Sequence, residues 1–469
     1  MSKSAEIADD LRALVGERFV VSDPTQMGAY LMEPRKRFHT PAAAVVRPGS
    51  VAEVQAIVRW ANERRAGLIP QGGNTGLVGA QVPVRGDEVI VSLQRLDSIR
   101  EVNAYAGNMV AEAGVILAHA HEAAEAEDAI FPLWLASQGS ARIGGVLSSN
   151  AGGVQVLAYG NARELCMGVE AVLPNGELYR GLNALRKDNT GYDLKDLLVG
   201  AEGTLGIITA ATLKLFHKPE GYETALCSVA SPAEALKLFY LVRERTGSRL
   251  SAFELMNRFG IELQLKHGML KRDPTASVSP WYALVEVNRM TGGAAGALQE
   301  ALEAAFEQDI ITDASVAGSE AERQVLWAAR EQMSDVQSLE GASIKHDVSV
   351  PIAKVPQLIA EGIAAAERVV PGIRPCPFGH MGDGNIHFNF SQPVRADGKA
   401  FMAGAEAVHE AVYDVVLKLG GSVSAEHGIG QLKTDLLKRV KDPVALATMR
   451  AIKQALDPNS IMNPGKMLG

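Results

Sequence analysis

Two histidines frame a glycine-containing turn in the segment that runs from Phe378 to Asn389. Asp383-Gly384 between them is typical of the two-residue loop of a β-hairpin. With that loop, His380 and His387 are directly opposite each other, and their Cβ atoms are roughly 4.5–5.5 Å apart on one face. Two imidazoles at this separation can reach one metal ion. The spacing therefore predicts a metal-binding hairpin, with Asn389 on the same face as the second histidine.

A carboxylate and a further imidazole occur in Ser424-Ala-Glu-His-Gly-Ile-Gly430. Two histidines and one glutamate around Zn²⁺ leave open positions, which is typical of a catalytic rather than a structural site. Neighbouring residues on an extended strand point to opposite faces, so Glu426 and His427 can serve one site only if the backbone is irregular there. The flanking glycines permit this irregularity. A zinc hydrolase that activates water stays open at this point.

Glycine makes up 46 of 469 residues, about 10%, against a usual share of about 7%. Three glycine-rich loops lie at 72–79, 138–153 and 200–206. Loops of this kind let backbone N–H groups approach phosphate oxygens without a Cβ in the way. No Gly-x-Gly-x-x-Gly follows a strand and no Gly-x4-Gly-Lys-Ser/Thr is present, which argues against a Rossmann dinucleotide site and a Walker nucleotide site.

The elements that position these loops follow from apolar periodicity. A strand at 42–46 precedes a helix that begins at a capping box of Ser50 and Glu53, and a second strand at 68–70 leads into the first loop, as in a βαβ unit. Lys218-Pro-Glu-Gly221 is the expected domain boundary. Beyond it, strands such as 225–229 and 281–287 alternate with helices such as 232–245, which indicates an α+β domain.

Composition excludes several classes of function. The net charge is −8 and no basic run occurs, so nucleic acid and anionic membrane are not expected as partners. The three cysteines are widely spaced and form neither a disulfide framework nor a thiolate metal site, which fits a reducing compartment. No basic and apolar leader opens the chain and no stretch approaches roughly 18 uncharged apolar residues. We expect a cytoplasmic protein without an integral membrane segment.

Four segments carry a family resemblance: Pro70-Gln-Gly-Gly-Asn-Thr-Gly-Leu-Val-Gly79, Ile143-Gly-Gly-Val-Leu-Ser-Ser-Asn-Ala-Gly-Gly153, Asn189-Thr-Gly-Tyr-Asp-Leu-Lys195 and Gly200-Ala-Glu-Gly-Thr-Leu-Gly-Ile-Ile-Thr209. They closely resemble the flavin-binding domain of the vanillyl-alcohol oxidase superfamily, in its D-2-hydroxyglutarate and D-lactate dehydrogenase branch, from about residue 39 to the end. The resemblance implies an α+β fold with a two-part FAD-binding domain of the p-cresol methylhydroxylase (PCMH) type. The expected divisions are a helical lead at 1–38, the FAD-binding domain at 39–218, an α+β substrate and metal domain at 219–456, and a tail at 457–469 that returns to the FAD.

The resemblance also implies which residues contact FAD. Because the first loop has no histidine, where some relatives attach the flavin, we expect non-covalent FAD. Close relatives often have histidine where Arg142 stands, so the contacts of this position are open. The expected cofactor-binding residues are Gly72, Gly73, Asn74, Thr75, Gly76, Leu77, Ser140, Ile143, Gly144, Gly145, Ser148, Gly152, Gly153, Glu202, Gly203, Ile207 and Asn463.

For the reaction, the resemblance makes His380, His387 and Glu426 ligands of Zn²⁺ or another divalent transition metal, and His427 the general base. Substrate carboxylates would be bound by Arg330, Ser334, Lys345 and Asn389. Relatives often carry threonine where Ser334 stands, so a methyl group that could tighten selectivity for a five-carbon diacid is missing.

The expected reaction is zinc-assisted oxidation of a D-2-hydroxy acid, with hydride transfer to flavin N5. The first-choice substrate is D-2-hydroxyglutarate, oxidised to 2-oxoglutarate; D-lactate, D-malate and glycolate are the alternatives on the same scaffold. An electron-transfer flavoprotein or a quinone is the expected electron acceptor. A non-catalytic flavin- or metal-binding module and the oligomeric state, including a homodimer, stay open.

Two further histidine clusters lack metal-site spacing. His119, His121 and Glu125 give His-Glu-x-x-Glu, and His409-Glu410 has no second histidine. We expect both clusters on solvated helix faces.

Overall fold

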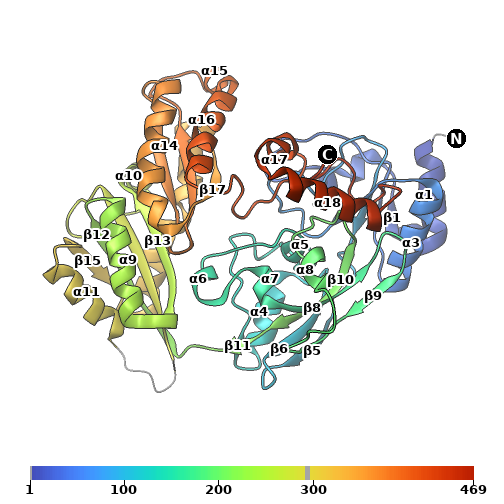
Figure 1. The fold of residues 1–469 in the computed structure, drawn as a ribbon, viewed down its shortest axis with the longest axis horizontal. Coiled ribbons are helices and arrows are strands. Elements are labelled where there is room, and N and C mark those ends of the chain that lie inside the picture. Colours follow the sequence, from blue (N-terminus) through green and yellow to red (C-terminus); the bar gives the residue numbers. More distant parts are fainter. Residues whose placement is uncertain (1–2, 291–295) are drawn as a thin grey trace. The chain divides into compact units, whose positions relative to one another are not determined.

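The computed structural model describes residues 3–290 and 296–469, and the first two residues of the expected N-terminal lead lie outside these ranges. The described chain forms two compact units (Figure 1). The first comprises Met1–Gly153, Gly160–Lys218 and Glu426–Gly469, and the second comprises Val154–Tyr159 and Pro219–Ala425.

The first unit contains two main sheets. A four-stranded sheet has the order β1-β2-β4-β3, formed by β1 (Val20–Val21), β2 (Ala44–Val46), β3 (Leu68–Gln71) and β4 (Val89–Ser92). A five-stranded antiparallel sheet has the order β5-β6-β10-β8-β9, formed by β5 (Ile99–Asn103), β6 (Asn108–Glu112), β8 (Cys166–Val172), β9 (Leu178–Gly181) and β10 (Ile207–Lys214). A small pair joins β7 (Ala129–Ile130) to β11 (Phe216–His217).

The predicted βαβ unit is confirmed. Helix α3 (Val51–Arg64) begins at Ser50, whose hydroxyl accepts the N–H of Glu53, and the helix connects β2 to β3, both of which pair in parallel with β4. The Glu53 carboxylate accepts the N–H of Gly49 rather than that of Ser50. Val54, Ile57, Val58 and Ala61 are buried as the periodicity predicts.

The N-terminal lead is part of this unit's core and is not purely helical. Helix α1 (Lys3–Val15) buries Ile7, Ala8, Leu11 and Val15 in the cluster that also holds the buried face of α3. Strand β1 pairs antiparallel with β2. The other helices of this unit are α2 (Gly28–Leu31), α4 (Leu117–Glu125), α5 (Ile143–Ser148), α7 (Ala162–Leu165), α8 (Leu194–Leu198), α17 (Thr434–Val440) and α18 (Pro443–Leu456).

The second unit is built on one eight-stranded sheet with the order β15-β12-β14-β13-β18-β19-β16, and β17 also pairs with β19. Its strands are β12 (Gly221–Val229), β13 (Leu250–Asn257), β14 (Trp281–Arg289), β15 (Asp313–Val316), β16 (Ser343–Ile344), β17 (Asp347–Ser349), β18 (Arg374–His380) and β19 (Asn385–Ser391). Its helices are α6 (Val156–Tyr159), α9 (Pro232–Thr246), α10 (Arg258–Lys266), α11 (Ala297–Glu307), α12 (Glu320–Glu331), α13 (Met333–Val336), α14 (Val355–Val369), α15 (Gly398–Ala403) and α16 (Ala405–Lys418).

Helices cover both faces of this sheet. Helices α9 and α11 pack on each other, as do α14 and α16. On the other face, residues of α10 and α12 join residues of β12, β13, β14 and β18 in one apolar cluster that includes Ile261, Trp327, Met256 and Phe378. The face that carries this cluster also carries His380 and His387, two of the candidate metal ligands.

The compact units differ from the expected domains in two places. Residues 154–159 belong to the second unit, because α6 packs on β13 and the Tyr159 hydroxyl accepts a hydrogen bond from Asn288 at 2.7 Å. Residues 426–456 belong to the first unit, where Lys453 Nζ donates to the carbonyl oxygen of Thr204 at 2.8 Å. The chain passes from one unit to the other at these places, and no local sequence pattern marks where it does so.

Candidate active site

The hairpin that carries both histidines has a register different from the predicted one. His387 lies opposite Phe378 rather than opposite His380. The two-residue loop is wrong because Met381–Asp383 form a 3₁₀ turn, after which Gly384 takes the left-handed conformation with φ 85°. His380 is therefore a diagonal neighbour of His387, still on the same face, and the ring centroids are 5.3 Å apart.

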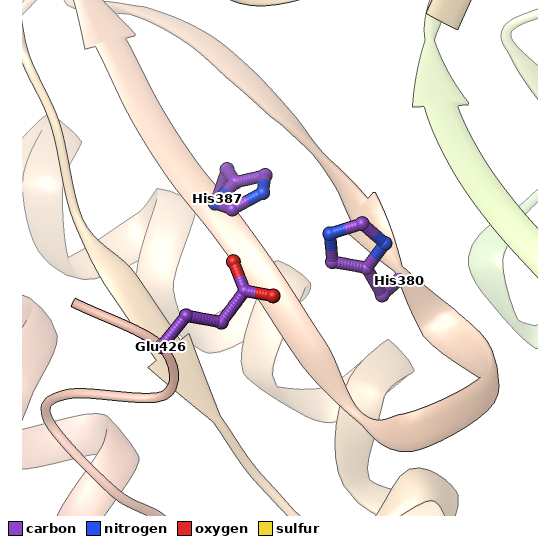
Figure 2. Close-up of side chains that lie close together, drawn as sticks. All are labelled: His380, His387 and Glu426. Atoms are coloured by element: carbon purple, nitrogen blue, oxygen red, sulfur yellow. The ribbon is translucent and has the colours of Figure 1, made fainter. Parts of the chain in front are cut away.

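Glu426 completes a group of three possible ligands. It directly follows Ala425, the last residue of the second unit, whose N–H donates to the carbonyl oxygen of Asp347 at 3.3 Å. One nitrogen of each histidine and one carboxylate oxygen all lie within 4.8 Å of one another. Figure 2 shows the three side chains directed toward one another. Two imidazoles and one carboxylate are suitable donors for Zn²⁺ and leave coordination positions open, so these residues fit a divalent metal.

Each of these histidines has a buried carboxylate directly opposite it on a neighbouring strand. Glu254 on β13 pairs with His380, and Asp347 on β17 pairs with His387. Glu254 Oε1 is 2.7 Å from His380 Nδ1, whereas Asp347 Oδ1 is 3.9 Å from His387 Nδ1. Burial would raise the pKa of Glu254, but His380 and Arg330 outweigh this effect and lower it to about 2. Glu254 is thus an ionised carboxylate inside the sheet.

Arg330, an expected substrate-binding residue, is buried at the end of α12 with 6% of its surface exposed. Its Nε donates to Glu254 Oε2 at 2.6 Å, and its guanidinium carbon lies 4.9 Å from the centre of the Phe378 ring. Among the described residues, Glu254 is the one hydrogen-bond partner of the guanidinium group. Its two terminal nitrogens stay available to bind an anion.

The other three expected substrate-binding residues also lie in the second unit. Lys345 Nζ donates to the hydroxyl of Ser334 at 3.1 Å and to its carbonyl oxygen at 3.2 Å. Asn389 is 2% exposed, and its Nδ2 donates to Gln337 Oε1 at 2.9 Å. The Asn389 Oδ1 atom is buried without a hydrogen-bond partner among the described residues. A buried acceptor of this kind is suited to a ligand hydroxyl or a water.

The backbone around His427 is irregular, as predicted. Residues 423–429 form neither helix nor strand, and Gly428 and Gly430 have φ of 78° and 54°. Glu202 anchors this loop, because its carboxylate oxygens accept the N–H groups of Ile429 and Gly430, each at 2.7 Å. Burial raises the pKa of Glu202 although both N–H donors oppose the shift. Glu202, which is expected to contact FAD, thus fixes the backbone that follows His427.

Within the first unit, the segments expected to bind FAD converge. A Cβ on Gly73 would lie 1.9 Å from the Ser140 carbonyl oxygen, so the first loop contacts the second through backbone alone. The Glu202 N–H donates to the Ser148 carbonyl oxygen at 2.8 Å, which joins the second loop to the third. Asn463 in the returning tail donates to the Glu202 carbonyl oxygen at 2.7 Å. Ile207, in contrast, is a core residue at the start of β10 with 1% exposure.

Several groups in this region fit a bound cofactor. The Oδ1 atoms of Asn74 and Asn463 are buried and have no hydrogen-bond partner among the described residues. Both residues have positive φ, 56° and 46°. A Cβ on Gly145, in the first turn of α5, would meet nothing within 4 Å. Unpaired buried polar atoms and an open position at a glycine are each expected where a polar ligand binds.

The structure also shows the contacts of Arg142. One terminal nitrogen of its guanidinium donates to the Gly114 carbonyl oxygen, and its Nε is buried without a partner in the described chain. Burial lowers the pKa of Arg142. The guanidinium thus binds the backbone at Gly114.

The expectation of solvated helix faces holds for His119, Glu125 and Glu410, which are exposed, and is wrong for the buried His121 and the half-buried His409. His121 is 9% exposed, its Nε2 lies 3.0 Å from the Leu133 carbonyl oxygen, and its ring lies 4.1 Å from that of Trp134. His409 Nδ1 lies 2.9 Å from Nε2 of the buried His346. The group of possible metal ligands found in the described ranges contains neither histidine. The three cysteines form no disulfide in the described chain, and all three are buried.

Glu254 was missed by motif-based reasoning because it belongs to no motif. The available signal was a single acidic residue inside the apolar run Leu250-Ser-Ala-Phe-Glu-Leu-Met256. Acidic residues are rarely buried unless they are paired. Such an interruption therefore indicates a partner elsewhere in the chain, without identifying that partner.

Comparison with protein families finds two models that together span most of the chain. The model for the FAD binding domain matches residues 42–181, and the model for the C-terminal domain of FAD linked oxidases matches residues 218–467. The chain therefore belongs to the FAD-linked oxidase family and is an oxidoreductase. This membership disfavours the zinc hydrolase that the metal ligands alone left open.

Curated relatives match over nearly the full length. The D-2-hydroxyglutarate dehydrogenase of Xanthomonas citri pv. viticola is 35% identical over 95% of this chain and 93% of its own. The mitochondrial D-2-hydroxyglutarate dehydrogenase of Bos taurus is 36% identical over 98% of this chain and 83% of its own. The D-2-hydroxyglutarate–pyruvate transhydrogenase of Saccharomyces cerevisiae is 33% identical over 95% and 90%.

Solved structures share the fold. Substrate-bound p-cresol methylhydroxylase superposes with a TM-score of 0.77 at 18% identity, covering 100% of this chain and 97% of that one. Alkyldihydroxyacetonephosphate synthase gives a TM-score of 0.71 at 17% identity, covering 99% and 85%. These values confirm the predicted two-part architecture of the p-cresol methylhydroxylase type. None of the helices in the described ranges has the length and apolar character needed to cross a membrane.

Proposed function

We propose that this chain is an FAD-dependent, metal-assisted dehydrogenase of D-2-hydroxy acids, with D-2-hydroxyglutarate as the first-choice substrate. The observation that carries the proposal is the convergence of His380, His387 and Glu426 within 4.8 Å in a member of the FAD-linked oxidase family. Full-length relatives named D-2-hydroxyglutarate dehydrogenase support the choice of substrate.

The residues proposed to act on the metal and the substrate divide into metal ligands and substrate-binding groups. His380, His387 and Glu426 would hold the metal. The terminal nitrogens of Arg330 and the ammonium of Lys345 would bind carboxylate oxygens, and the unpaired Asn389 Oδ1 would accept a hydrogen bond from a substrate hydroxyl. Two cations favour a diacid, although one cation serves any 2-hydroxy acid.

The first unit would supply the proton acceptor and the flavin site. His427 would take the hydroxyl proton, because a neutral imidazole is a suitable base near pH 7. When bound, the metal would act as a Lewis acid toward the hydroxyl group. When bound, the flavin would accept the hydride. The loop at 72–79 has no histidine or cysteine, so we propose that FAD is held without a covalent bond.

The electron acceptor rests on the family resemblance alone, and the compartment rests on the cysteine spacing. We propose an electron-transfer flavoprotein or a quinone as electron acceptor and the cytoplasm as compartment; the homologous enzymes of Bos taurus and Danio rerio are named as mitochondrial. A homodimer would be detected by sedimentation at micromolar concentration.

Substrate selectivity is tested by anaerobic bleaching of the flavin absorbance. The purified protein is mixed with D-2-hydroxyglutarate, D-malate, glycolate, and D- and L-lactate. We expect fast bleaching by D-2-hydroxyglutarate and none by L-lactate. Faster bleaching by D-lactate or glycolate would replace the first-choice substrate, and a protein that cannot be loaded with FAD would refute the dehydrogenase.

The roles of His427 and of the metal are tested separately. His427→Ala should slow the bleaching by roughly 10²–10⁴-fold, the usual contribution of a general base, with flavin still bound. His119→Ala, on the exposed side of α4, is the control and should behave as wild type. Chelator treatment should stop bleaching, and Zn²⁺ should restore it. Full activity after complete metal removal would exclude metal assistance.

A further inference from the structure

Glu254 contacts both His380, which is expected to bind the metal, and Arg330, which is expected to bind the substrate. It is 1% exposed in the middle of β13. Its Oε1 lies 2.7 Å from Nδ1 of His380, and its Oε2 accepts Nε–H of Arg330 at 2.6 Å. Burying an ionised carboxylate costs several kcal/mol unless both oxygens are paired. Glu254 therefore depends on both partners for its place in the sheet.

Backbone pairing determines this geometry. Glu254 and His380 are directly opposite each other in the antiparallel β13–β18 pair, so their side chains leave the same face of the sheet. Helix α12 packs against this face and delivers Arg330 to the other oxygen. The contact to His380 is therefore set by strand register rather than by a flexible side chain.

Oε2 of Glu254 is paired with the permanently charged guanidinium of Arg330, so the carboxylate group acts as an acceptor and Nδ1 of His380 donates to Oε1. A neutral imidazole with Nδ1 protonated has its lone pair on Nε2, which is the form that ligates a metal. The same carboxylate fixes the Nε edge of Arg330 and leaves its terminal nitrogens for an anion.

We infer that Glu254 is the positioning residue of the site: it sets the tautomer and ring orientation of His380 for metal binding and holds Arg330 for the substrate carboxylate. This inference rests on the proposed function. It assigns Glu254 no direct contact with substrate or cofactor. A glutamine cannot replace it, because His380 and Arg330 both donate and an amide has a single acceptor oxygen.

The chain provides a matched control one strand away. Glu286 on β14 is 0% exposed and accepts Nε–H of Arg323 at 2.7 Å and Nε1–H of Trp327 at 2.7 Å. Arg323 and Arg330 lie on the same helix, α12. Both carboxylates are thus buried, pair with an arginine of α12 and stabilise the same helix on the same sheet. Of these two carboxylates, Glu254 is the one with a histidine among its described hydrogen-bond partners.

The experiment compares Glu254→Gln with Glu286→Gln in the full chain. Zn²⁺ affinity is measured by competition with a chromophoric chelator, together with the thermal midpoint and the flavin content. Both variants should lose thermal stability. Glu254→Gln should bind Zn²⁺ roughly 10–100-fold more weakly, the usual effect of losing such a partner, while Glu286→Gln stays within about twofold of wild type.

If either glutamine variant fails to fold, the charged pairs are replaced by apolar side chains. Glu254→Met with Arg330→Met leaves no buried charge behind, and such replacements are often neutral for stability. This double variant should still lose Zn²⁺ affinity, because the carboxylate that accepts from Nδ1 of His380 is removed. Glu286→Met with Arg323→Met should not lose Zn²⁺ affinity.

The outcomes separate this inference from the proposed function. If His380→Ala binds Zn²⁺ as tightly as the wild type does, the metal site itself is refuted. Loss of affinity in His380→Ala together with unchanged affinity in Glu254→Gln would refute only the role of Glu254. Equal losses of Zn²⁺ affinity in the Glu254 and Glu286 variants would show that both carboxylates act only as structural ion pairs.

Discussion

Single residues explain why glycine is abundant in the first unit. At Gly73, a Cβ would lie 1.9 Å from the Ser140 carbonyl oxygen, so the two loops can touch only because no side chain is present. At Gly145, the space above the Cα is open. Gly73 thus allows the two loops to pack together, and Gly145 leaves space suited to a ligand.

Gly145→Ala should separate folding from flavin binding. The added methyl group meets no protein atom within 4 Å, so the thermal midpoint of the flavin-free protein should not fall. If the cofactor covers this position, FAD affinity should drop by at least tenfold, as measured by fluorescence titration. Gly139→Ala is the control, because its Cβ also meets nothing and the residue is exposed. Equal FAD affinity in both variants would place the flavin elsewhere.

At the scale of elements, one carboxylate joins α10, β18 and the 3₁₀ turn at Gln337–Glu340. Glu340 accepts hydrogen bonds from Lys266, from His267 Nε2 at 2.7 Å and from Arg374 at 3.1 Å. Lys266 is the largest contributor, and together the partners lower the pKa of Glu340 to about 2. The turn precedes β16 and β17, the strands beside His387.

This pKa predicts an acid-dependent stability. A glutamate whose folded-state pKa is depressed stabilises the fold above its unfolded pKa of about 4.3, and this contribution is lost as the pH falls toward 2. Glu340→Gln should be less stable than wild type at pH 7, and the difference in unfolding free energy should shrink between pH 5 and pH 2.5. Urea melts at several pH values measure it, with the exposed Glu244→Gln as control. A constant difference would contradict the prediction.

At the scale of the whole molecule, the apolar interiors of both units exclude solvent from the three cysteine thiols. Burial raises the pKa of each thiol, Cys166, Cys227 and Cys376, to about 12. The thiolate is the reactive form, so none of the three should react with iodoacetamide at pH 8 in the folded protein. All three should react in denaturant. Mass spectrometry counts the adducts, and rapid modification of the native protein would show that one of the cores opens.

Much of the fold was predictable because its signals are local. The capped helix α3, the parallel strands around it and the alternating elements after residue 218 follow from apolar periodicity and capping chemistry. Histidine, glutamate and glycine types at short spacing likewise indicated the hairpin and the loop that contribute His380, His387 and Glu426.

The sequence by itself thus determined which residue types are available and which family they indicate. The tertiary structure alone decided the register of the hairpin, the burial of His121, the anchoring of the His427 loop by Glu202 and the pairing of Glu254 with His380. The last two pairs are separated by more than a hundred residues along the chain. A buried charge must find its partner wherever strand pairing and helix packing bring one, and no local pattern encodes that choice.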